Sequence, residues 1–224
     1  MGIFSWYSDY KDKSAERYIQ KSIKVIKNSK SIRDERLIAI QFFREHPNPE
    51  IAIPALLQRF EYSLEHGIND TREKENCMEG ILTFGDGAIP LVQEHLMKTM
   101  CIAWPIKIIK QLCHSPDAVV SVLLEALDYT DVMFSEAKVD KNYDILCYLV
   151  DYKKPGLSQK VAHFLNDPDE RVRFAAAEVM MEQDDPEVRE LLERFIPDES
   201  AENRRLHQAV SELFAKKGWA VQKN

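Results

Sequence analysis

The sequence predicts an all-α fold, and more specifically an α-solenoid of about six antiparallel helix pairs. Only seven of the 224 residues are glycine, which suits helices better than a turn-rich β fold. No alternating apolar run is flanked by an Asn-Gly or Asp-Gly hairpin turn. Ala52-Ile53-Pro54 returns as Ala88-Ile89-Pro90, and this spacing of 36 residues lies in the range of helical solenoids.

A second repeat lies near the C-terminal end. One apolar stripe with the spacing of a buried helix face comprises Val172, Ala175, Ala176, Val179 and Met180. The equivalent stripe 34 residues later comprises Leu206, Ala209, Val210, Leu213 and Phe214. The two repeats together predict helix pairs that stack on one another.

The first three pairs follow from apolar spacing and from proline. The expected helices cover about residues 13–28, 32–45, 49–66, 71–84, 88–100 and 104–113. The second of these is apolar on nearly every side, which indicates burial between neighbours. Asn48 and Pro49 suit the cap and the first turn of the third helix. Residues 1–12 are expected to be irregular.

The last three pairs follow in the same way. The expected helices cover about residues 116–127, 139–152, 155–166, 168–181, 185–195 and 201–217. The six pairs therefore begin near residues 14, 49, 86, 116, 155 and 185. Residues 128–138 form the longest connection. The array is expected to span residues 13–217, with Gly218 ending the last helix and a tail over 218–224.

The stretch from Leu165 to Met181 reads LNDPDERVRFAAAEVMM. It resembles the HEAT repeat, most closely the bacterial variety named after phycobilisome lyases, in which D-x-x-V-R and small residues open the second helix of each pair. Asp167 is expected to cap this helix, and Val172 and Ala176 to lie in its core. The resemblance implies that Asp169 and Arg173 pair between adjacent repeats. His207 stands where a repeat of Arg173 would fall.

The sequence offers no constellation for catalysis. The six histidines are far apart, and neither HExxH, GxSxG nor a phosphate-binding GxxxxGK[ST] loop occurs. Cys77, Cys101, Cys113 and Cys147 are widely spaced, so we expect reduced core thiols in a cytoplasmic protein. We therefore expect no enzyme, no metal and no cofactor. No run of about 18 apolar residues predicts a transmembrane helix.

Charge is distributed unevenly along the chain. Residues 1–112 contain 16 Lys and Arg against 15 Asp and Glu, whereas residues 113–224 contain 14 against 22. An acidic C-terminal half disfavours nucleic acid as a partner. The sequence predicts a non-enzymatic scaffold that binds a protein partner through its concave face. The alternatives are a lyase or chaperone-like protein resembling the phycobilin lyases, and a nucleic-acid-binding HEAT-like protein.

The predicted binding surface lies opposite the apolar stripe around Ala176. A rotation of 100° per residue places Phe174, Glu178 and Met181 there, with Arg171 at the margin. The last helix would extend this surface with Arg205, Gln208 and Glu212. Two interpretations stay open for Phe174 and Met181. Adjacent repeats bury them, or they form the apolar centre of a docking groove.

The N-terminal region offers a separate surface. The first helix carries a basic stripe of Lys13, Arg17, Lys21, Lys24 and Lys27. This stripe is a solvated face, or it docks on an anionic membrane or an acidic partner. The upstream apolar residues are Ile3, Phe4, Trp6 and Tyr7. They could insert at a membrane interface, or fold back and cap the first repeat.

Overall fold

The computed structural model describes residues 3–130, 135–198, 200 and 202–220. In these ranges all regular structure is helical, with twelve α-helices, three 3-10 helices and no strand. The all-α prediction is therefore confirmed. The chain divides into two compact units, Met1–His114 and Ser115–Asn224.

The first unit contains six α-helices and two 3-10 helices. In chain order they are α1 (Ile3–Lys27), α2 (Arg33–Arg44), α3 (Pro49–Leu57), η1 (Gln58–Glu61), α4 (Gly67–Leu82), η2 (Gly85–Ala88), α5 (Ile89–Lys98) and α6 (Ala103–Leu112). Successive pairs pack on one another, because α2 contacts α4, α4 contacts α6, and α3 contacts both α1 and α5. Their shared core includes Ile26, Phe43, Leu56 and Ile81, all fully buried.

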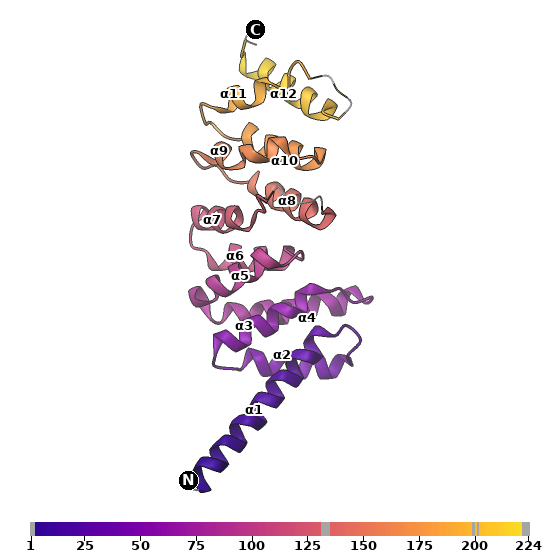
Figure 1. Ribbon diagram of the computed structural model, residues 1–224, viewed down its shortest axis with the longest axis vertical. Helices are drawn as coiled ribbons and strands as arrows, with labels where there is room; N and C mark the ends of the chain where they lie inside the picture. The colour runs from indigo at the N-terminus through magenta and orange to yellow at the C-terminus, as the bar shows by residue number, and fades with distance from the viewer. Residues whose placement is uncertain (1–2, 131–134, 199, 201, 221–224) are drawn as a thin grey trace. The chain divides into compact units, whose positions relative to one another are not determined.

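The second unit contains the other six α-helices and one 3-10 helix. They are α7 (Pro116–Ala126), α8 (Glu136–Leu149), α9 (Leu157–Val161), η3 (Ala162–Asn166), α10 (Glu170–Met181), α11 (Val188–Glu193) and α12 (Arg204–Lys217). Figure 1 shows α8, α10 and α12 along one side of this unit, and α7, α9 and α11 along the other. Contacts join α8 to α10 and α10 to α12.

Several helix ends lie where the local sequence predicts them. The Asn48 side chain accepts a hydrogen bond of 2.9 Å from the amide of Glu50, and Pro49 opens α3. The Ser115 hydroxyl caps α7 in the same way, 3.2 Å from the amide of Ala118. Gly218 ends α12 with φ of 65°, a left-handed conformation that favours glycine.

The N-terminal prediction is wrong. Residues 1–12 were expected to be irregular, but α1 begins at Ile3. No glycine or proline lies between Ile3 and Lys27, so nothing in the sequence stops the helix from extending toward the N-terminus. Residues 1–2, residues 131–134 of the long connection, and residues 221–224 of the tail lie outside the described residues.

The start of α10 also differs from the prediction. Asp169, not Asp167, is the N-cap, and its carboxylate accepts a hydrogen bond of 2.8 Å from the amide of Arg171. Asp167 instead accepts from the amide of Asp169 at 2.9 Å and shapes the preceding turn. An aspartate can bond the amide two residues ahead in a turn as well as in a cap, so local sequence does not distinguish the two positions.

Candidate partner-binding face on α8, α10 and α12

Arg171 joins α8 to α10 on the exposed side of the second unit. Its guanidinium lies 3.0 Å from the carboxylate of Asp140 on α8 and 3.2 Å from that of Asp169. It also lies 5.9 Å from the ring centroid of Tyr143. Burial alone would raise the pKa of Asp169, but hydrogen bonds from the Arg171 side chain and amide outweigh it and lower the pKa. The Arg171 side chain remains exposed.

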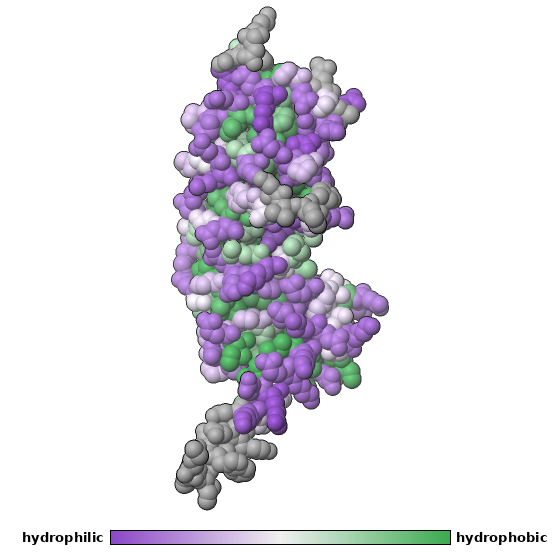
Figure 2. All heavy atoms as spheres, viewed as in Figure 1, coloured by the Kyte–Doolittle hydropathy of each residue, from purple (hydrophilic) through white to green (hydrophobic). Residues whose placement is uncertain are grey.

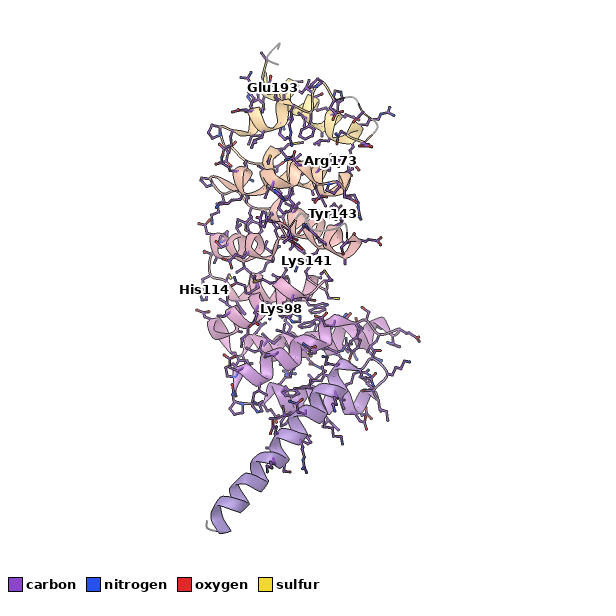
Figure 3. All side chains as sticks on the ribbon, viewed as in Figure 1. Lys98, His114, Lys141, Tyr143, Arg173 and Glu193 are labelled. Carbon is purple, nitrogen blue, oxygen red and sulfur yellow. The ribbon has the colours of Figure 1, made fainter. Side chains whose placement is uncertain are left out.

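Arg173 has a structural role, although not with the partner that the family resemblance implies. Its guanidinium donates to the carbonyl oxygens of Asp167 and Pro168, at 2.8 and 2.9 Å. It also donates to Asn203 Oδ1 at 2.9 Å and to the carbonyl of Glu202 at 3.1 Å. The bonds to Asn203 and Glu202 connect α10 to the segment before α12. Figure 3 labels Arg173 on α10.

The expected pair between Asp169 and Arg173 is therefore wrong. The Asp169 carboxylate is already engaged by the α10 amide and by Arg171. The buried guanidinium of Arg173 donates instead to three backbone carbonyls and to the side chain of Asn203. At the equivalent position of α12, His207 Nδ1 lies 3.1 Å from the carbonyl oxygen of Phe195.

Phe174 is covered by a residue of the next helix pair. The side chain of Phe174 is 7% exposed, and the guanidinium of Arg205 lies 3.7 Å from its ring centroid. Met181 is half-buried. Of the two interpretations left open by the sequence, burial by a neighbouring repeat holds for Phe174. The centre of this face is consequently a guanidinium stacked on an aromatic ring.

Two titratable pairs lie beside this stacked contact. Glu178 is half-buried, and burial raises the pKa of its carboxyl, although the nearby Arg205 charge opposes that shift. On α8, a hydrogen bond with Cys147 raises the pKa of Tyr143, and burial raises the pKa of the Cys147 thiol. Figure 3 labels Tyr143 on α8, on the same side as the N-terminal end of α10.

The remaining predicted residues extend the face along α12. Gln208 and Glu212 are both exposed, and their side chains form a hydrogen bond of 3.0 Å one turn apart. Of the seven predicted contact residues, Arg171 and Arg205 are thus exposed cations, whereas Phe174 lies beneath the surface. Val172 and Ala176 are fully buried, as predicted for the core of α10.

The contribution of α8 to this face was not predicted from the sequence. Asp140, Tyr143, Asp144 and Cys147 belong to this face, but the repeat pattern was too weak over residues 101–152 to align them. The sequence does contain one indication that these residues share a helix face. Asp140 and Asp144 are four residues apart, as are Tyr143 and Cys147, and residues at this spacing are neighbours on a helix surface. The expectation that all cysteines are core thiols is also wrong. Cys77 is buried, whereas Cys101 and Cys147 are exposed because they occupy outward positions.

The first unit contains a buried cluster of charged side chains, and these side chains pair with one another. Arg59 and Glu73 are almost completely buried, and Arg59 Nε lies 2.8 Å from Glu73 Oε2. Arg36 binds both carboxylate oxygens of Glu73 at 3.0 Å. Asp70 accepts from Arg59 at 2.7 Å and from Lys74 at 2.8 Å. Every carboxylate oxygen has a partner, so the cluster stabilises the packing of α2, η1 and α4.

Comparisons with protein-family models, with curated proteins and with solved structures gave no match. In the part of the chain that the structure describes, no group of three or more His, Cys, Asp or Glu side chains is arranged to hold a metal ion. No helix in the described ranges is both long and apolar enough to cross a membrane.

Proposed function

We propose that the chain is a non-enzymatic helical-repeat scaffold that holds a protein partner against α8, α10 and α12. In this proposal the six helix pairs form an α-solenoid of the HEAT-like type, and these second helices line its concave side. The resemblance around Arg173 and the contacts from α8 to α10 and from α10 to α12 support the arrangement.

The observation that carries the proposal is the stacking of Arg205 on Phe174 in the middle of the face. The ring is covered, while Arg205 itself remains exposed. Arginine and aromatic residues contribute most of the binding energy in many protein interfaces. A guanidinium already ordered on a ring loses less side-chain freedom when a partner binds it.

The charges of the face indicate the chemistry of the partner. Asp140, Asp144, Glu178 and Glu212 supply four carboxylates, whereas Arg171 and Arg205 supply two guanidiniums. Asp140 is partly neutralised by Arg171, but Asp144 has a raised pKa because burial and the charge of Asp140 both disfavour its ionised form. A protein segment with lysine or arginine beside an acceptor group for Arg205 fits this pattern.

A binding titration tests the proposal once a partner has been purified with the chain from its native host. The variant combines Arg171→Glu with Arg205→Glu, and we expect it to weaken binding by at least about tenfold. The matched control combines Lys160→Glu with Lys216→Glu, which makes the same change in charge at exposed positions of the same unit. Equal affinity of both variants for the partner would reject this face as the binding site.

A further inference from the structure

We propose that the basic stripe of α1 binds the surface of an anionic lipid bilayer. The stripe consists of Lys13, Arg17, Lys21, Lys24 and Lys27, and all five side chains are exposed. None of them forms an ion pair with another described residue. The stripe belongs to the first unit, and the proposal does not depend on the face of the second unit.

The stripe lies on the side of α1 that faces away from its own unit. At 100° per residue the five cations fall within an arc of about 120°, centred roughly 160° from the buried Ile26. In Figure 2 the described part of α1 next to the grey segment is strongly hydrophilic. Packing of α1 on α2, η1 and α3 therefore leaves the cations free.

The stripe is also nearly free of opposing charge. Glu16 is the one acidic residue between Lys13 and Lys30, a segment with six lysine and arginine residues, and Asp9 and Asp12 precede this segment on α1. A local excess of this size on one helix face is large enough to concentrate anionic lipid headgroups. The elongated arrangement along several helical turns suits a flat anionic surface better than a single bound anion.

The residues that precede the stripe in the sequence favour a bilayer over other anionic partners. The five cations are spaced by four, four, three and three residues, and steps of three, four and three residues from Lys13 toward the N-terminus reach Tyr10, Trp6 and Ile3. All of these residues belong to α1. Tryptophan and tyrosine favour the interface between headgroups and acyl chains, and isoleucine favours the acyl chains. Duplex nucleic acid would use the cations but has no apolar layer for these residues.

Co-sedimentation of the full chain with lipid vesicles tests the proposal. We expect binding to vesicles of phosphatidylcholine mixed with phosphatidylserine, little binding to phosphatidylcholine alone, and weaker binding as salt is raised. Lys21→Glu combined with Lys24→Glu should weaken binding by at least about tenfold, because each cation near an anionic surface contributes substantially. Lys160→Glu combined with Lys216→Glu is the control and should bind as the wild type does.

Substitutions of Trp6 distinguish binding to a bilayer from binding to other anionic partners. Trp6→Ser keeps every charge, so it should weaken vesicle binding severalfold, while Trp6→Phe should retain most of it. Circular dichroism of each variant establishes that the helices are intact. The proposal is overturned by equal binding to both kinds of vesicle, by no binding to either, or by binding that Trp6→Ser leaves unchanged. Tighter binding to duplex DNA than to the anionic vesicles, with the same dependence on Lys21 and Lys24, would also overturn it.

Discussion

At the scale of single residues, the contact between Arg205 and Phe174 determines what the second unit presents to a partner. The spacing of α10 placed Phe174 opposite the core stripe, but spacing along one helix cannot show what the next helix lays over it. The next pair supplies Arg205, whose guanidinium covers the ring. The sequence thus predicted the position of Phe174 and left its exposure open.

Phe174→Ala should lower the free energy of unfolding by about 3 kcal/mol, near the low end for a buried phenylalanine, because the ring is covered on one side by an exposed polar side chain. Chemical denaturation measures this change. Gln208→Ala on the exposed side of α12 is the control and should stay within about 0.5 kcal/mol of the wild type. A loss for Phe174→Ala as small as that of the control would mean that the ring is not packed.

Glu178→Gln should alter how stability depends on pH. Burial raises the pKa of Glu178, so the folded state holds its proton more tightly than the unfolded state does. The cost of ionising this carboxyl in the folded protein therefore grows as the pH rises above its ordinary pKa of about 4.3. Relative to the wild type, Glu178→Gln should gain stability as the pH rises above about 4.3, until the pH passes the raised pKa of Glu178 in the folded state, and unfolding curves from about pH 4 to pH 7 measure this gain. A difference in stability that stays constant over this range would contradict the assignment.

At the scale of helices, the sequence predicted the apolar stripes well and the charged contacts poorly. The stripe of α10 is buried as expected, because a spacing of three and four residues must bring its members to one side. The cluster of Arg36, Arg59, Asp70 and Glu73 was not predicted, because its members come from three elements with no regular spacing. Which charges meet in such a cluster depends on how the pairs pack, and local sequence does not carry that information.

Glu73→Gln should destabilise the first unit by about 3–5 kcal/mol at neutral pH, because it leaves the buried guanidinium of Arg36 without its carboxylate and that of Arg59 with Asp70 alone. The wild type should also lose stability more steeply in acid. Burial would raise the pKa of Glu73, but hydrogen bonds from Arg36 and Arg59 lower it, so its contribution is lost as the pH falls below about 4.3. Unfolding curves at pH 7 and pH 3 measure both effects. Parallel acid dependence in the variant and the wild type would show that Glu73 is not the group responsible.

Ala176→Glu should destabilise the protein by several kcal/mol, because Ala176 is fully buried and the new carboxylate would have no partner there. Thermal unfolding followed by circular dichroism measures the loss. Ala215→Glu makes the same change at an exposed position near the end of α12 and serves as the control. Equal melting temperatures for the two variants would place Ala176 at the surface.

At the scale of the whole molecule, the two units differ in charge. Residues 1–114 contain 16 Lys and Arg against 15 Asp and Glu, and residues 115–224 contain 14 against 22. Six of the sixteen cations of the first unit nevertheless lie on α1, while four carboxylates lie on the face of the second unit. One chain therefore offers two surfaces of opposite character, and we assign a bilayer to the first and a protein partner to the second.

Site-specific photo-crosslinking tests the central claim most directly, namely that a protein partner binds the face formed by α8, α10 and α12. A photoreactive amino acid is placed at Asp140, Gln208 or Glu212 on this face, and at Gln159 or Lys160 on α9 as controls; all five positions are exposed. In the native host we expect one discrete protein adduct from the three face positions, lost on adding Arg171→Glu with Arg205→Glu, and no such adduct from α9. The same adduct from α9 alone, or an adduct that survives both charge reversals, would contradict the account.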